Sequence, residues 1–237
     1  MRVGEKCVFT LDSTYFGGKL KPRHRYKGSY AGVYRDDDWV VYRGAKLRAK
    51  TVEPIKKPTV KKEKAPTASD YKNCSDMLFE IGVRYRDDWR SIISGKQFEE
   101  YDWNGLQAGH GCSRQYWDTR HAPKNCHAIT SGENYAMSIG NSQIIMKYWE
   151  YVAKTYGEFY AKTLINMKHE PMKLNIGYLK EDCIFCYNFF YVWLVVWCEK
   201  YNKKRDPDEV IKKRCEKFTK AKTDGIMKVL KIVKGEL

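Results

Sequence analysis

The sequence predicts an α+β protein in which a small N-terminal β-barrel and a mainly helical domain are joined by a linker. Three observations favour this organisation: β-branched and aromatic runs in the first 52 residues, a lysine- and proline-rich stretch without apolar periodicity, and helical periodicity after it. The expected parts are 1–52, a linker over 53–70, and 71–237. Because 43% of the residues are hydrophobic, a mainly disordered chain is excluded.

The N-terminal domain contains three strand-like runs, over 3–11, 29–35 and 38–52. Short runs rich in Val, Tyr and Trp are typical of a small antiparallel barrel, and we expect an SH3-like or KOW-like one. Barrels of this size bind nucleic acids, peptides or other subunits, so the fold leaves these alternatives open. The linker combines prolines with many lysines, which indicates a flexible and extended tether.

The charge of the chain favours a polyanionic partner. The formal net charge is +15, and the first 66 residues contain 17 Lys and Arg against 7 Asp and Glu. Each Lys or Arg that pairs with a phosphate releases a condensed counterion, so nucleic acid is the expected partner. A basic protein that binds no nucleic acid is the alternative. The residues expected to contact nucleic acid are Arg23, Arg25, Lys27, Arg43, Lys46, Arg48, Arg114 and Arg120.

The second domain has helical patterns on both sides of a turn-rich block. Apolar spacing predicts a helix over 71–89, and Asn141 or Ser142 is expected to cap a helix that Gly157 ends. Further helices are expected over 159–167, 183–198 and 208–233. The uncharged run 183–198 has 16 residues, fewer than the roughly 20 that span a bilayer. We therefore expect a buried core helix there and no membrane contact.

The beginning of the chain and its cysteines favour a cytoplasmic protein. The sequence MRVGEKCVFT lacks the apolar core of a signal peptide, and eight cysteines are too few for a disulfide scaffold. We expect reduced thiols. Cys183 and Cys186 have the spacing of a metal-binding pair, but they lie in an apolar run without a second pair, which favours buried thiols.

Residues 106–141 combine histidines and asparagines in a predicted β-hairpin followed by a helix. This arrangement resembles the HNH, or ββα-metal, nucleases. The resemblance implies that His110 is a general base, that Asn125 orients the His110 ring or braces the loop, and that His127 is a further catalytic residue. The metal ligands that it implies are Asn134, Asn141 and Asp118.

Within 88–170 the chain also resembles the phage recombination endonucleases called NinG or Rap. The shared pattern is Ala108-Gly109-His110, Arg120, Asn125-Cys126-His127, Asn134 and Gly140-Asn141. The resemblance implies an endonuclease that uses Mg²⁺ or Mn²⁺ and cuts branched DNA in recombination or replication. It also implies a place in the host cell cytoplasm if the protein is phage-encoded, with a homodimer as one expected assembly.

The chain departs from this family at two cysteine pairs that bind structural zinc. It has Ser91, Ser94, Thr130 and Glu133 at these positions. Hydroxyl groups do not hold a structural zinc ion, so no structural zinc is expected. Either an aromatic core replaces the zinc, or the domain is a catalytically degenerate nuclease that binds nucleic acid or a host factor. A structural protein of a ribonucleoprotein particle is a third possibility.

Overall fold

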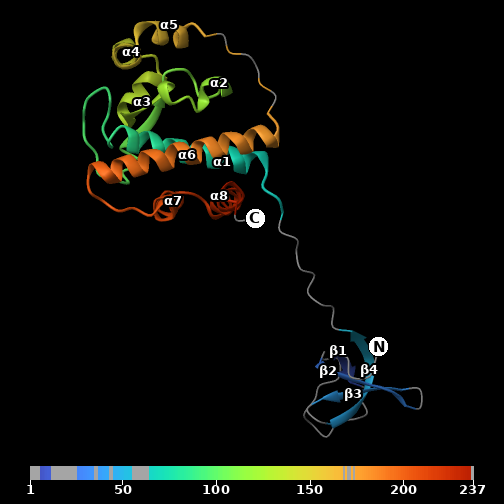
Figure 1. Cartoon of the computed structure of the whole chain (residues 1–237). Helices are drawn as coiled ribbons and strands as arrows, with labels where there is room; N and C mark the ends of the chain where they lie inside the picture. The colour runs from blue at the N-terminus through green and yellow to red at the C-terminus, as the bar shows by residue number, and fades with distance from the viewer. Residues whose placement is uncertain are drawn as a thin grey trace. The chain divides into compact units, whose positions relative to one another are not determined.

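The computed structural model divides the chain into two compact units, Met1–Glu63 and Lys64–Leu237 (Figure 1). It describes the strands β1 (Lys6–Leu11), β2 (Tyr26–Tyr34), β3 (Asp37–Tyr42) and β4 (Ala45–Pro54) by their backbone, and then residues 64–167, 169, 172 and 174–235. The boundary between the units falls inside the range predicted as a linker, 53–70. The described residues form both helices and antiparallel sheets, which confirms the α+β class.

The four N-terminal strands form a closed antiparallel barrel in the order β1-β2-β3-β4, and β4 pairs back to β1. The strand-like run over 38–52 contributes to two strands, β3 and β4. The two strands pair with Tyr42 opposite Ala45. Only two residues separate these partners in the sequence, which is the length of the commonest β-hairpin connection.

Two long helices of the second unit, α1 (Ala68–Arg86) and α6 (Ile176–Lys200), lie side by side and run in the same direction (Figure 1). A capping box starts α1, because Thr67 Oγ1 accepts from the Asp70 N–H at 3.3 Å and the Asp70 carboxylate accepts from the Thr67 N–H at 2.7 Å. On α6 the buried residues recur every three or four positions: Leu179, Cys183, Cys186, Phe190, Leu194 and Trp197. This spacing makes one apolar stripe along the helix.

The helix α6 buries less of its surface than the sequence predicted. Outside the buried stripe, the side chains of Phe185 and Val192 are 45% and 53% exposed. The continuous apolar run therefore predicted the helix correctly, but it did not indicate that the rest of the protein buries only one face of this helix. Within the part of the chain that the structure describes, α6 is the one helix long and apolar enough to cross a membrane by length and composition.

A hairpin of β5 (Leu106–His110) and β6 (Cys126–Thr130) lies between two groups of helices. Its register places His110 opposite Cys126 and Gly109 opposite His127. Directly opposite residues share a face of a hairpin and successive residues alternate, so His110 and His127 lie on different faces. Cys126 belongs to the core that contains α1 and α6, whereas Ile129 packs on α4 (Ser142–Tyr156) and α5 (Glu158–Ile165).

Helix α3 (Ser131–Ser138) follows β6 without a break. The sequence did not predict this helix, because the helix expected after the hairpin was the one that begins at Asn141 or Ser142. Thr130 caps α3, Asn141 caps α4, and Gly157 ends α4; the last two confirm the prediction. The short α2 (Trp117–Arg120) and a 3₁₀ turn, Pro123–Asn125, lie in the loop between the strands.

The C-terminal stretch predicted as one helix over 208–233 is two helices, α7 (Pro207–Cys215) and α8 (Lys220–Val233). The prediction was wrong because the apolar spacing continues through the break. Thr219 is the N-cap of α8 and accepts from the Lys222 N–H at 3.5 Å. A threonine before a new helical turn is a start signal, and it separates the helices here.

Candidate functional site

A cavity of about 790 Å³ opens beside the end of β5. It is lined by residues of α1, β5, the loops before and after β5, α3, α4 and α7. The charged and catalytic-type residues in its lining are Glu80, Arg84, His110, Arg114, Asn134 and Arg214. Two residues that the sequence predicted for separate roles in one site, His110 and Asn134, therefore lie in the lining of the same cavity.

His110 has a fixed tautomer. Its Nε2 lies 2.9 Å from the carbonyl oxygen of Arg120, and since a carbonyl only accepts, Nε2 carries the proton. The basic nitrogen is then Nδ1, which lies 3.7 Å from Sγ of Cys126, a weak donor. Burial lowers the pKa of His110 to about 4, so the ring is neutral at neutral pH.

Asn125 braces the loop that orients His110. Its side chain is fully buried, accepts from the Cys112 N–H at 2.7 Å, and donates to the carbonyls of Cys112 and Thr119 at 3.1 and 3.0 Å. Thr119 precedes Arg120, whose carbonyl accepts the hydrogen bond from His110. Of the two roles predicted for Asn125, the structure gives it loop bracing, and through the loop it fixes the His110 ring.

Asn134 reaches the hairpin because Gly109 has no side chain. The Asn134 Nδ2 donates to Oε1 of Gln107 at 2.7 Å, and its Oδ1 lies 3.3 Å from the position that a Cβ on residue 109 would occupy. The same Cβ would overlap the side chain of Ile129. The absence of a side chain at 109 therefore leaves room mainly for Ile129 of β6, and Asn134 of α3 packs beside the same position.

The cavity carries a net positive charge. The Glu80 carboxylate lies 4.0, 3.8 and 3.4 Å from the guanidinium groups of Arg84, Arg114 and Arg214. Burial lowers the pKa of Arg84 to about 10, which leaves it charged at neutral pH. Three cations around one carboxylate attract a further anion, and Arg114, whose side chain is 62% exposed, is accessible to it.

A second cavity, of about 530 Å³, continues this basic surface. It shares Arg114 and Arg214 with the first cavity and adds Lys72 of α1 and Lys222 of α8. The two cavities together form a groove of positive charge from His110 to α8. We call it the basic groove.

His127 lies away from the cavity, on the other face of the hairpin. Its ring is fully buried, and Nδ1 lies 2.7 Å from Nη2 of Arg86 and 3.6 Å from Oδ2 of Asp87. Burial lowers the pKa of His127. Because its neighbours are interior groups, His127 supports the packing of β6 and does not meet the His110 cavity as predicted.

Two of the three predicted metal ligands also lie elsewhere. Asn141 caps α4, and its Oδ1 accepts from the Ile144 N–H at 3.2 Å. The exposed Asp118 carboxylate accepts from Nδ1 of His169 at 2.9 Å. Only Asn134 of the predicted ligands lines the cavity.

Of the predicted nucleic-acid contacts, Arg114 and Arg120 both line the basic groove, Arg114 with an exposed side chain and Arg120 with only 4% of its surface exposed. Arg120 donates from Nε and Nη2 to the two oxygens of Asp76 at 2.7 and 2.6 Å, so its charge is neutralised inside the fold. Arg23, Arg25 and Arg43 lie outside the described residues, and Lys27, Lys46 and Arg48 lie in strands described by their backbone alone.

The four positions at which the resemblance places zinc-binding cysteines meet in space. Ser91 Oγ donates to Oε2 of Glu133 at 2.6 Å, and the same oxygen accepts from the Thr130 N–H at 2.7 Å. The Ser94 N–H donates to Ser91 Oγ at 3.2 Å. We call these four residues the knuckle cluster. Hydrogen bonds join three of its members directly and the fourth through Ser91.

A divalent ion fits the cavity through few protein ligands. Mg²⁺ keeps several waters and is usually bound by one or two carboxylates together with substrate phosphates. Among the residues that line the cavity, Asn134 Oδ1 is a neutral oxygen beside β5, and Glu80 is a carboxylate already surrounded by guanidinium groups. Among these residues Asn134 is the one that would offer an oxygen to the ion, and phosphate oxygens and waters would have to complete the coordination.

The sequence did not single out Glu80 and Arg214 for the site, nor the contact of His121 with Asp182. Glu80 and Arg214 lie 134 residues apart, and no local motif connects them. His121 and Asp182 lie 61 residues apart, with a hydrogen bond of 2.8 Å between Nδ1 and Oδ1. The position of His121 directly after Arg120 was the only available signal.

No family model, curated protein or solved structure matches this chain.

Proposed function

We propose that this protein is a metal-dependent endonuclease of the HNH type that hydrolyses a phosphodiester in branched or otherwise structured DNA. One observation carries the proposal: His110 and Asn134, expected as base and metal ligand, line one cavity with three arginines. The hairpin-to-helix succession and the knuckle cluster support it, because they follow the order of the resemblance.

In this mechanism, Nδ1 of His110 accepts a proton from the attacking water while the Arg120 carbonyl holds the ring through Nε2. Arg114 and Arg214 pair with phosphate oxygens and stabilise the charge that develops on them. A Mg²⁺ or Mn²⁺ ion beside Asn134 would polarise the scissile phosphate and stabilise the leaving oxygen.

The N-terminal unit adds affinity in this proposal. We infer that its four-stranded barrel is an SH3-like module that binds the DNA backbone, since the first 66 residues hold 17 Lys and Arg. A tether raises the effective concentration of one module near the other, so the barrel would bind an arm of the same DNA molecule. Branched DNA offers such an adjacent arm.

A second candidate is a nucleic-acid-binding protein without cleavage activity. Glu80, the carboxylate nearest to the cavity arginines, is engaged by them, and the basic nitrogen of His110 faces the Cys126 thiol. Both features favour anion binding over metal-assisted hydrolysis. This candidate predicts tight binding of the same substrates and no cutting in any metal.

The test is cleavage of labelled four-way junctions, linear duplexes and single strands with Mg²⁺ or Mn²⁺ and with EDTA. The informative variant is His110→Gln, whose amide still donates to the Arg120 carbonyl but offers no basic nitrogen. We expect it to bind DNA and to lose cleavage, while His169→Ala, outside the cavity, cleaves normally. Binding without metal-dependent cleavage by the unmodified chain would establish the second candidate instead.

A further inference from the structure

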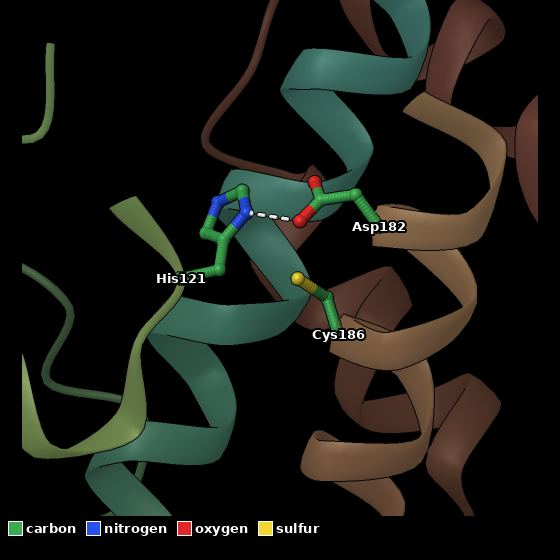
Figure 2. Close-up of side chains that lie close together, drawn as sticks. All are labelled: His121, Asp182 and Cys186. Atoms are coloured by element: carbon green, nitrogen blue, oxygen red, sulfur yellow. Dashed lines mark hydrogen bonds and ion pairs between the residues drawn. The ribbon is translucent and has the colours of Figure 1, made fainter. Parts of the chain in front are cut away.

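Three metal-ligand side chains converge between the loop after α2 and helix α6 (Figure 2). They are His121, Asp182 and Cys186, and one ligand atom from each lies within 4.8 Å of the others. Asp182 and Cys186 are four residues apart on α6, so one face of the helix presents both. Imidazole, carboxylate and thiolate are the three ligand types that zinc takes in proteins.

A neighbouring carboxylate orients the imidazole for this role. The Nε2 of His121 lies 3.0 Å from Oδ1 of Asp76, so Nδ1 points to Asp182 and Cys186. Arg120 in turn holds Asp76 with two hydrogen bonds. Histidines that bind metals commonly donate their second N–H to a carboxylate in this way, which fixes the ring and raises the basicity of the ligand nitrogen.

Asp182 has an oxygen that the protein leaves unpaired. Its side chain is 10% exposed, and Oδ2 is buried without a hydrogen-bond partner, whereas Oδ1 faces His121. A buried carboxylate oxygen without a donor is uncommon, because most such atoms are hydrogen-bonded. A cation beside Oδ2 would satisfy it.

A divalent ion can replace two protons of the cluster without changing its formal charge. Without an ion, the two ring nitrogens of His121 face the carboxylates of Asp182 and Asp76, and Arg120 pairs with Asp76. When a divalent ion displaces the Nδ1 proton of His121 and the thiol proton of Cys186, the sum of the charges is unchanged. The interior therefore gains no net charge on binding the ion.

We propose that His121, Asp182 and Cys186 bind one transition-metal ion of the Zn²⁺ class, with Asp76 as the positioning carboxylate. The site is separate from the knuckle cluster and from the His110 cavity. An ion there would tie α6 to the loop between β5 and β6, and this loop also contains the Arg120 carbonyl that orients His110. The proposal does not depend on the nuclease activity.

The test uses the full chain, stripped with a chelator and titrated with Zn²⁺ or with Co²⁺, whose thiolate complexes absorb light. We expect one ion per chain and a thiolate–Co²⁺ band. Cys186→Ser and Asp182→Asn should each lower the affinity at least tenfold, and Asp76→Asn should lower it roughly 10- to 100-fold. Cys183→Ser is the matched control, because Cys183 is equally buried on α6 and outside the cluster.

Loss of binding in Cys183→Ser would overturn this ligand set in favour of a Cys183–Cys186 pair. Absence of stoichiometric binding by the unmodified chain would overturn the site itself. If a variant fails to fold, zinc X-ray absorption on the unmodified chain still decides: we expect one sulfur at about 2.3 Å and nitrogen or oxygen at about 2.0–2.2 Å. A shell with no sulfur, or with more than one, would contradict the proposal.

Discussion

Ser91 donates a hydrogen bond of 2.6 Å from its Oγ to Oε2 of Glu133, 42 residues later in the chain. The same carboxylate oxygen accepts from the Thr130 N–H, so one oxygen joins the loop after α1 to the start of α3. This contact fixes the helix that presents Asn134 to the cavity. The knuckle cluster thus positions the site through hydrogen bonds.

Glu133→Gln should destabilise the second unit. A hydrogen bond to a charged group contributes roughly 1.5–3 kcal/mol, and the amide keeps only part of this contribution. Burial raises the pKa of Glu133, but the hydrogen bonds from Ser91 and Thr130 outweigh burial and lower the pKa. The loss of stability caused by Glu133→Gln should therefore be largest above the ordinary glutamate pKa. It should shrink as the pH falls through the pKa that Glu133 has in the folded protein.

Urea unfolding at several pH values measures this difference, with Glu99→Gln as the control on an exposed glutamate. An equal loss of stability for Glu133→Gln at all pH values would contradict the role assigned to its charge.

The pKa values of His110 and His121 should be shifted in opposite directions. Burial lowers the pKa of His110 to about 4. For His121 burial also favours the neutral ring, but the Asp182 and Asp76 carboxylates outweigh it and raise the pKa. Histidine ring NMR in metal-free protein should show His110 neutral at neutral pH and His121 keeping its second proton to a higher pH than an exposed histidine does, and His110→Gln assigns the first signal.

Because the pKa of folded His110 lies below the unfolded value of about 6.5, its contribution to stability is lost progressively as the pH falls below that value. A His110 midpoint near 6.5 would mean that the ring is exposed to solvent and that the cavity geometry differs.

Asn125→Ala should be among the most destabilising single substitutions in the loop. It leaves the Cys112 N–H and the Cys112 and Thr119 carbonyls without their partners. Each unsatisfied buried group costs about 1–3 kcal/mol, so the unfolding free energy should fall by about 3 kcal/mol or more. Chemical denaturation measures it. As a control, Asn166→Ala changes an exposed asparagine and should alter stability by less than about 0.5 kcal/mol. Similar losses of stability in both variants would contradict the loop-bracing role of Asn125.

Deleting residues 1–63 should weaken DNA binding and flatten its salt dependence. The second unit has its own core, so it should remain folded. Each phosphate contact contributes about 0.9 to the slope of log K against log salt, and the barrel contributes much of the positive charge. Fluorescence anisotropy at several salt concentrations measures the slope. An unchanged slope would place the phosphate contacts in the basic groove alone.

Secondary structure around the site was largely predictable from local patterns. Apolar spacing gave α1, α4 and α5, and the Asn141 cap and the Gly157 end of α4 were confirmed. Such signals work because helix ends and buried faces depend on residues close together in the chain. The same reasoning missed the break before Thr219, because apolar spacing continues across it.

The sequence by itself determined the order of hairpin and helix and the ends of the helices, and it singled out His110 and Asn134 as members of one site. Only the tertiary structure decided which residues join them. It placed His127 on the opposite face of the hairpin, buried Arg120 against Asp76, and brought Arg214 to the cavity. Local patterns report hydrogen bonding and burial within a turn or a strand, whereas these contacts join residues that only packing of the whole domain brings together.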